Sequence, residues 1–235
     1  MRSIRPIPSI FALLFALVLG SVAAAAEPLP ETSPEGMVLM KDTKLRIVYA
    51  MPGATLDQYT KVILLDCYVA FRKDWQKDKN REAISLSQQV KTSDMEKIKK
   101  KVADGFREVF TEELQTKGGY AIVDQSGEDV LIVRPAIMNL DITAPDIQSS
   151  SMTRGVVASA GQMTLFMELY DSSTGDIIAR VIDPQAADRG GFAMMASSVT
   201  NTAEAKRIIR KWAETLRSHL GELDKAVTAE DSGQN

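Results

Sequence analysis

Apolar residues between positions 93 and 117 recur every three or four positions, which is the spacing of one face of an α-helix. Ser93 and Glu96 stand three residues apart at the start of this run, as in a capping box, and Gly118 and Gly119 end it. We therefore expect a long amphipathic helix here. Its predicted buried stripe consists of Met95, Ile98, Val102, Phe106, Val109, Phe110 and Leu114.

A second helical stripe lies near the C-terminal end of the chain. Asn201 is a favourable N-cap residue, and Glu204 follows at the third helical position. The apolar positions after this cap keep the helical spacing. The predicted stripe consists of Ala205, Ile208, Ile209, Trp212, Leu216, Leu220 and Leu223.

Strand patterns precede the first helix. Residues 61–71 are almost continuously apolar and rich in β-branched and aromatic side chains, which predicts a central strand buried on both faces. Residues 44–50 predict a weaker first strand. Residues 72–92 are polar and lack periodicity, so we expect a long loop there.

Two further strands are predicted at residues 120–123 and 130–140. Pro135 interrupts the second of them. Because proline has no amide hydrogen to donate to a neighbouring strand, we expect an edge or bulged position there.

The region after residue 161 has the pattern of a β-hairpin. Apolar and polar residues alternate through residues 162–170, turn-forming residues fill 171–176, and residues 177–182 resume the apolar pattern. The complete order is two strands, a helix, four strands and a helix. It favours a single α+β domain, with a largely antiparallel sheet and two long amphipathic helices packed on one face.

The first 26 residues differ in kind from the rest. Arg2 and Arg5 precede an apolar run at residues 10–19, and small residues follow up to Ala26. This is the pattern of a secretory signal peptide, so we expect cleavage after Ala26 and a periplasmic location. The apolar run is shorter than the roughly 20 residues that a membrane-spanning helix needs, and we expect no membrane span.

Composition divides the chain into four predicted segments. A signal peptide at residues 1–26 is followed by a proline-containing extended leader at 27–43. The single α+β domain occupies residues 44–223, and a disordered tail occupies 224–235.

Charge and cysteine content restrict the partners. The chain carries 28 Lys and Arg against 31 Asp and Glu, which disfavours nucleic acid because such binding needs clustered positive charge. Cys67 is the single cysteine and lies in an apolar run, so we expect a buried thiol. It lies far beyond the expected cleavage site, and we therefore expect no lipid anchor. Asp66 interrupts the same run and is expected to form a salt bridge or to lie exposed at an edge.

The sequence contains no recognisable catalytic, metal-binding or phosphate-binding motif. The single histidine, His219, is predicted to be a surface residue of the second helix. We expect no cofactor, no metal and no enzymatic activity. The carboxylates of Glu168, Asp171 and Asp183 leave a carboxylate hydrolase as an alternative, although turn roles and a cross-strand pair between Glu168 and Arg180 are favoured.

Two segments rich in Gly and Ser, residues 149–161 and 189–198, also contain large apolar side chains. Packing beneath the sheet is the favoured interpretation, and a surface for an apolar ligand or a partner protein is the alternative. Trp75 is interpreted in the same way, as a residue tucked onto the domain or as a partner anchor. The candidate surface consists of Trp75, Val156, Val157, Phe192, Met194 and Met195.

Several short motifs resemble the bacterial family called domain of unknown function 3313, many of whose members are described as lipoproteins. The most specific motif is the hairpin signature E-L-Y-D-S-x-T-G at residues 168–175. The resemblance covers about residues 56–220. It implies an α+β envelope protein and supplies no activity or site residues. The other matching motifs are residues 59–62, 66–69 and 131–146, Trp75, Trp212 and Ala213.

Together, export and the missing catalytic motifs predict a non-enzymatic accessory or protein-binding module of the cell envelope, with an envelope protein as its partner. A carrier of a small apolar ligand is one alternative. A hydrolase that uses carboxylates or a serine is another. The oligomeric state stays open at this point.

Overall fold

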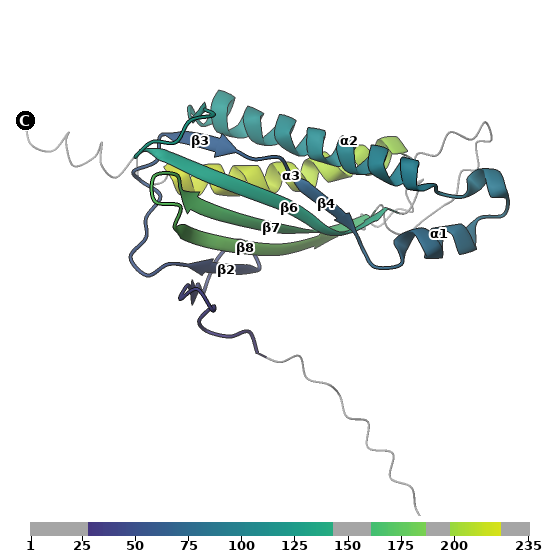
Figure 1. Ribbon diagram of the computed structural model, residues 1–235, viewed down its shortest axis with the longest axis horizontal. Coiled ribbons are helices and arrows are strands. Elements are labelled where there is room, and N and C mark those ends of the chain that lie inside the picture. The colour runs from purple at the N-terminus through teal and green to yellow at the C-terminus, as the bar shows by residue number, and fades with distance from the viewer. Residues whose placement is uncertain (1–27, 143–160, 187–197, 222–235) are drawn as a thin grey trace, which may run out of the picture. The chain divides into compact units, whose positions relative to one another are not determined.

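Eight strands form one sheet in the order β1-β2-β8-β7-β6-β3-β5, and β4 also pairs with β6 (Figure 1). The computed structural model describes residues 28–142, 161–186 and 198–221. The elements below belong to one compact unit, Glu31–Asn235. The strands are β1 (Val38–Leu39), β2 (Ile47–Ala50), β3 (Lys61–Leu64), β4 (Tyr68–Phe71), β5 (Ala121–Ile122), β6 (Val130–Ile142), β7 (Gly161–Asp171) and β8 (Ile177–Ala186). The helices are α1 (Trp75–Glu82), η1 (Leu86–Gln88), α2 (Thr92–Thr111), the π-helix η2 (Glu112–Lys117) and α3 (Ser198–Gly221).

Most of the sheet is antiparallel. From β1 through β2, β8 and β7 to β6, all four neighbouring pairs of strands are antiparallel. β3 and β4 run parallel to β6, and β5 runs parallel to β3. The predicted α+β class and the largely antiparallel sheet are therefore confirmed.

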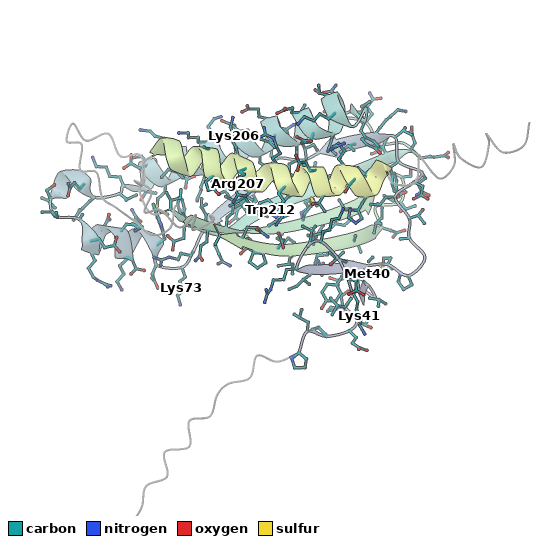
Figure 2. All side chains as sticks on the ribbon, turned by 180° about the vertical axis from the view of Figure 1, so that it is seen from behind. Met40, Lys41, Lys73, Lys206, Arg207 and Trp212 are labelled. Atoms are coloured by element: carbon teal, nitrogen blue, oxygen red, sulfur yellow. The ribbon has the colours of Figure 1, made fainter. Side chains whose placement is uncertain are left out.

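The alternation of side chains along β7 shows which face of the sheet carries the hydrophobic core. Met163, Leu165, Met167 and Leu169 are all buried core residues, as the alternating sequence predicts. α2 and α3 run beside each other and contribute to the same core (Figures 1 and 2). Their fully or nearly fully buried side chains are Phe106, Val109, Phe110, Ile208, Ile209, Trp212, Leu216 and Leu220.

The apolar run at residues 61–71 forms two strands, so the prediction of one continuous central strand is wrong. β3 and β4 pair with successive parts of the same edge of β6, and the chain leaves the sheet at residues 65–67 between them. Asp66 lies exposed at this break, where it accepts a hydrogen bond from Arg107 Nη2 at 2.7 Å. The predicted salt bridge of Asp66 is therefore confirmed.

Pro135 lies in the middle of β6, at neither an edge nor a bulge, contrary to the prediction. The gap between β3 and β4 at residues 65–67 explains why a proline is tolerated there. The carbonyl of Val133 accepts a hydrogen bond from Leu65 N at 3.0 Å, so alternate residues of β6 direct their backbone groups toward this edge. The donor that Pro135 lacks therefore falls opposite residues 65–67, where no strand is paired.

The region predicted as a loop at residues 72–92 contains α1 and η1. α1 is polar on most of its surface, so it lacks the apolar stripe by which helices are recognised. Both long helices also begin earlier than predicted. α2 begins at Thr92, where Asp94 accepts a hydrogen bond from the Lys91 amide at 2.9 Å, and α3 begins at Ser198.

Part of the segment expected to be an extended leader is packed on the domain. Met37 is completely buried, and the neighbouring β1 pairs with β2. Glu35 forms an ion pair with Arg180 of β8, with 2.9 Å between Oε1 and Nη2. This pair lowers the pKa of Glu35 to about 2.

Candidate functional site

A cavity of about 450 Å³ lies where β6 and β8 end and β7 begins. Ile142 stands opposite Gly161, and Gln162 stands opposite Ala186, so three strand ends converge there. We name this end of the domain, with the cavity and α1, the open end. The residues that line the cavity are Arg72, Asn139, Gln162, Met163, Thr164, Pro184, Gln185 and Ala186.

Arg72 is the charged residue of the cavity lining, and two carboxylates neutralise it. Its Nη1 donates to Asp78 Oδ2 and its Nε donates to Asp141 Oδ2, both at 2.6 Å. The hydrogen bond to Asp78, followed by the one to Asp141, raises the pKa of Arg72. Arg72 in turn lowers the pKa of Asp78. The remaining polar groups of the lining are amides and a hydroxyl. The cavity therefore presents neutral hydrogen-bonding groups to a ligand.

Two unusual backbone conformations shape the cavity wall. Asn139 has a φ of 53° in the irregular stretch of β6 between Met138 and Asp141. Gly161 has a φ of 140°, and a Cβ at this position would lie 2.5 Å from the carbonyl oxygen of Asp141. The close pairing of β6 and β7 at the open end therefore requires glycine.

Trp75 attaches α1 to the open end. Its side chain is 1% exposed, stacks on Phe71 with 4.2 Å between ring centroids, and donates from Nε1 to the carbonyl of Ile142 at 3.3 Å. The favoured interpretation, a residue tucked onto the domain, agrees with this burial. As a partner anchor it would have to be accessible, so Trp75 does not belong to an exposed surface.

The other five candidate surface residues fall outside the described residues. Val156 and Val157 lie in the connection from β6 to β7, and Phe192, Met194 and Met195 lie in the connection from β8 to α3. Because the strand ends at Ile142, Gly161 and Ala186 are neighbours, both connections begin at the open end. The placement of the two apolar segments themselves lies outside the described residues.

The opposite end of the sheet is closed by the hairpin turn, and we name it the closed end. Asp171 Oδ1 accepts hydrogen bonds from the amides of Ser173 and Thr174 at 2.8 and 2.9 Å. Asp171 Oδ2 accepts from Tyr59 Oη at 2.8 Å. The Thr174 amide and Tyr59 lower the pKa of Asp171, whereas burial and Asp171 raise the pKa of Tyr59 to about 12. The predicted hairpin and the turn role of Asp171 are confirmed.

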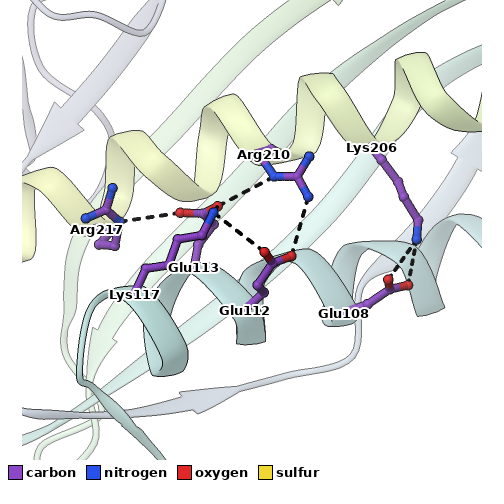
Figure 3. Close-up of polar contacts among 7 residues, drawn as sticks. All are labelled: Glu108, Glu112, Glu113, Lys117, Lys206, Arg210 and Arg217. Carbon is purple, nitrogen blue, oxygen red and sulfur yellow. Dashed lines mark hydrogen bonds and ion pairs between the residues drawn. The ribbon is translucent and has the colours of Figure 1, made fainter.

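A buried ion cluster joins η2 to α3 near the closed end (Figure 3). Glu113 is completely buried; its Oε1 lies 2.5 Å from Lys117 Nζ and 3.6 Å from Arg210 Nε. Its Oε2 lies 3.5 Å from Arg217 Nε, and both of these atoms lack a hydrogen-bond partner among the described residues. Glu113 raises the pKa of Lys117. Charge attraction, with imperfect hydrogen bonding, therefore holds this carboxylate in the helix interface.

The sequence did not predict this cluster, although it contains a signal for it. Glu113 follows Val109 by four positions and Phe110 by three, so it falls on the buried stripe of the helix. A carboxylate on such a stripe must find positive partners when it is buried. Arg210 and Arg217, spaced by two turns on the second helix, supply them.

Glu168 and Asp183 project from opposite faces of the sheet. Asp183 stands opposite the core residue Leu165, whereas Glu168 lies three positions after Leu165 and so on the other face. Glu168 Oε1 accepts from Arg180 Nε at 2.9 Å, which confirms the predicted cross-strand pair. The candidate carboxylates therefore do not converge on a common site, as a two-carboxylate hydrolase would need.

Asp183 is 2% exposed and serves as a hydrogen-bond acceptor for neutral groups. Its Oδ2 accepts from Trp212 Nε1 and from Gln185 Nε2, both at 2.7 Å. Its Oδ1 accepts from the Arg46 amide at 2.9 Å. Figure 2 shows Trp212 on α3, beside the sheet to which this hydrogen bond ties the helix. Asp183 is thus a structural residue that fixes α3 to β8 and β2.

The remaining titratable candidates have ordinary roles. Cys67 is buried, and this burial raises the pKa of its thiol to about 12, as expected for an unreactive cysteine. His219 lies on the surface of α3, with Nδ1 2.7 Å from the Thr215 carbonyl. Within residues 28–142, 161–186 and 198–221, no group of three His, Cys, Asp or Glu side chains could hold a metal ion. No helix in these ranges is long and apolar enough to cross a membrane.

A family model matches residues 38–216, which is most of the chain. The chain belongs to the family described as "Protein of unknown function (DUF3313)". No curated protein matches it.

Among solved structures, the chain is similar to the PelC dodecamer from Paraburkholderia phytofirmans in two crystal forms. One, of a point variant, is 13% identical with a TM-score of 0.38 and covers 72% of this chain and 95% of PelC. The other is 12% identical with a TM-score of 0.37 and covers 72% and 96%. Scores of this size describe a distant likeness.

The hairpin motif at residues 168–175 of this chain has a structural explanation. Its first residue is Glu168, which pairs across the strands, and Asp171 closes the turn. Ser172 Oγ donates to the Gly127 carbonyl at 2.9 Å, and Gly175 has a φ of 76° that favours glycine. This motif therefore forms part of the closed end, whereas the cavity is lined by other residues.

Proposed function

We propose that the protein is an exported, non-enzymatic binding module that works in the periplasm and binds an envelope partner protein at its open end. The observation that carries the proposal is the cavity at the converging ends of β6, β7 and β8. Its lining offers neutral hydrogen-bond donors and acceptors around a neutralised Arg72. Such a lining suits recognition better than proton transfer, which needs a titratable group free to change charge.

The periplasmic location is supported by the signal-peptide pattern of the first 26 residues. Fractionation of cells that produce the protein tests it. We expect the periplasmic fraction to hold a shortened chain that begins at Glu27. A full-length chain confined to the cytoplasm would contradict export.

Crosslinking in intact cells, followed by purification, tests the binding role. We expect one envelope protein to be recovered repeatedly with the native chain. Thr164→Arg places a large cation in the cavity lining and should reduce this recovery by about tenfold or more, a change on the order of 1.4 kcal/mol in binding free energy. Ser173→Arg, in the exposed hairpin turn of the closed end, is the matched control and should leave recovery unchanged. A chain that stays solitary, or equal losses in both variants, would contradict the proposal.

The cavity also favours a second candidate function, a carrier of a small polar ligand. Its volume of about 450 Å³ lies within the usual range for ligand sites. Arg72, Asn139, Gln162, Thr164 and Gln185 make the lining more polar than an apolar ligand would require. Native mass spectrometry of protein purified from its own cells distinguishes the two functions. A co-purified small molecule that Thr164→Arg removes would favour the carrier.

A further inference from the structure

Two aliphatic side chains project from the segment between α1 and α2 at the open end. Ile84 is 89% exposed and Leu86 is 81% exposed. Among the large hydrophobic side chains that the structure describes as exposed, these two have the highest exposed fractions. The exposed Ser85 separates them, and we name residues 83–89 the tip.

Hydrogen bonds to Val90, the residue that follows the tip, fix it to α1. Asn80 both donates to the Val90 carbonyl at 3.1 Å and accepts from the Val90 amide at 2.7 Å. Gln76 Nε2 donates to the same carbonyl at 2.9 Å, and Val90 is 2% exposed. Inside the tip, Gln88 Oε1 accepts from the Ile84 amide at 3.1 Å. The polar side chains thus bind backbone groups, and the aliphatic side chains are left facing water.

The stretch of chain that contains the tip carries an excess of positive charge. Residues 72–91 contain six Lys and Arg against three Asp and Glu, although the whole chain has an excess of acidic residues. Asp78 pairs with Arg72 and Arg81, and Glu82 pairs with Lys79. Within the described ranges, the exposed lysines at the two ends and the middle of this stretch make no ion pair; they are Lys73, Lys77 and Lys91. Figure 2 shows Lys73 at the end of the domain that carries α1.

We propose that the tip docks on an anionic lipid surface, with Ile84 and Leu86 inserted among the lipids and the surrounding lysines against the headgroups. Aliphatic side chains flanked by basic residues are the composition of interfacial membrane contacts. A protein-binding site of standard size buries about 800 Å² on each partner and favours Trp, Tyr and Arg over Leu and Lys. The tip exposes an isoleucine and a leucine, and the tryptophan of α1, Trp75, is buried.

This inference does not depend on the proposed function. The cavity and the tip lie at the same end of the domain, and α1 connects them through Trp75 and through Asp78, the partner of Arg72. Docking through the tip would therefore place the cavity close to the membrane surface. Peripheral contact of this kind needs no membrane-spanning helix.

A fluorescent probe at the tip tests the proposal directly. The full chain carries one cysteine, Cys67, which is buried with a raised pKa, so a new surface cysteine can be labelled selectively. We would attach an environment-sensitive dye to Leu86→Cys and, as the matched control, to Ser173→Cys at the closed end. Each labelled protein would be mixed with phosphatidylcholine vesicles, with or without phosphatidylglycerol. Both proteins keep the same N-terminal segment, so any membrane binding by that segment is common to both.

We expect a blue shift for the Leu86 probe with phosphatidylglycerol vesicles, weakened by salt, and no shift for the Ser173 probe. Vesicle binding of the unlabelled chain should fall by about tenfold in the double variant Ile84→Ser and Leu86→Ser. The unfolding temperature of this variant should stay near that of the native chain, because both side chains are exposed. Equal shifts for the two probes, equal shifts with neutral and anionic vesicles, or no shift at all would overturn the proposal. Crosslinking of the tip to a protein in cells, without vesicle binding, would also overturn it.

Discussion

The two ends of the sheet differ in how their polar groups are paired. At the closed end, Asp171 takes up the turn amides and Tyr59, and Glu113 gathers three cations in the helix interface. At the open end, three strands stop around a cavity, and half-buried ion pairs of Arg72 join α1 to β6.

The difference indicates a division of labour within one sheet. At the closed end, the turn amides and Tyr59 occupy the Asp171 carboxylate, and the Glu113 carboxylate is buried among three cations, so neither carboxylate is available to a ligand. At the open end, amide side chains face a cavity and aliphatic side chains face water. Structural residues are concentrated at one end, and groups available for recognition are concentrated at the other.

Removal of Trp75 should have the largest effect on stability. Trp75→Ala deletes a buried indole, its stacking on Phe71 and its hydrogen bond to Ile142, and should lower the free energy of unfolding by about 3–5 kcal/mol. Trp75→Phe keeps an aromatic ring that can stack on Phe71 but loses the hydrogen bond and part of the buried indole, with an expected cost of about 1–2 kcal/mol. Urea denaturation measures both values. Similar small losses in the two variants would show that α1 is not part of the cooperative unit.

Neutralisation of Glu113 should have the next largest effect. Glu113→Gln leaves three cations without their buried partner and should cost about 2 kcal/mol. Glu112→Gln is the matched control, because Glu112 is half exposed and its ion pairs are solvated, and it should cost less than about 1 kcal/mol. Thermal unfolding of both variants at pH 7 provides the comparison. Equal losses of stability in the two variants would show that the buried ion pairs of Glu113 stabilise the fold no more than the exposed ones of Glu112.

A pair of glycine substitutions compares the two ends directly. Gly161→Ala at the open end forces a Cβ to within 2.5 Å of the Asp141 carbonyl oxygen and should cost about 2–3 kcal/mol. Gly175→Ala at the closed end meets nothing within 4 Å but keeps a φ of 76°, so about 1 kcal/mol is expected. Chemical denaturation of the two variants tests the ranking. A reversed order would show that β6 and β7 can separate at the open end without cost.

The smallest predicted effect is a pH dependence of α1 at the open end. Arg72 lowers the pKa of Asp78 below its unfolded value of 3.8, so this contact stabilises the fold above that pH and is lost as the pH falls further. Hydrogen exchange in α1, corrected for its intrinsic rate, should therefore become faster between pH 5 and about 3. In Arg72→Gln this change should be weaker, while the hairpin amides behave as in the native chain. If α1 in Arg72→Gln showed the same dependence of hydrogen exchange on pH as in the native chain, the contact between Arg72 and Asp78 would not be its cause.

Periodicity predicted the parts of the fold in which one face is buried. The stripes around Phe106 and Ile209 and the alternation of β7 each reflect a single apolar environment. α1 escaped prediction because it is attached through one residue, Trp75, and is otherwise polar. The break between β3 and β4 was not predicted because the residues on both sides of it are apolar. Its signals in the sequence were Asp66 within the run and Pro135 on the partner strand.

The candidate site was harder to predict than the fold. The apolar segments were selected by composition, and the connections that contain them begin at Ile142 and Ala186, at the open end. The cavity itself is made by residues from β6, β7 and β8 and by Arg72, which lie far apart in the sequence and form no motif. Asp78 of α1 and Asp141 of β6 neutralise Arg72. The pairing with Asp141, 69 positions away in the sequence, is visible only in the folded chain.

Site-specific photocrosslinking in cells tests the division of labour most directly. A photoreactive amino acid would replace Thr164 at the open end or Ser173 at the closed end, both accessible positions outside the core. The account predicts crosslinks to an envelope partner from position 164 and none from position 173. Crosslinks from position 173, with none from position 164, would contradict it.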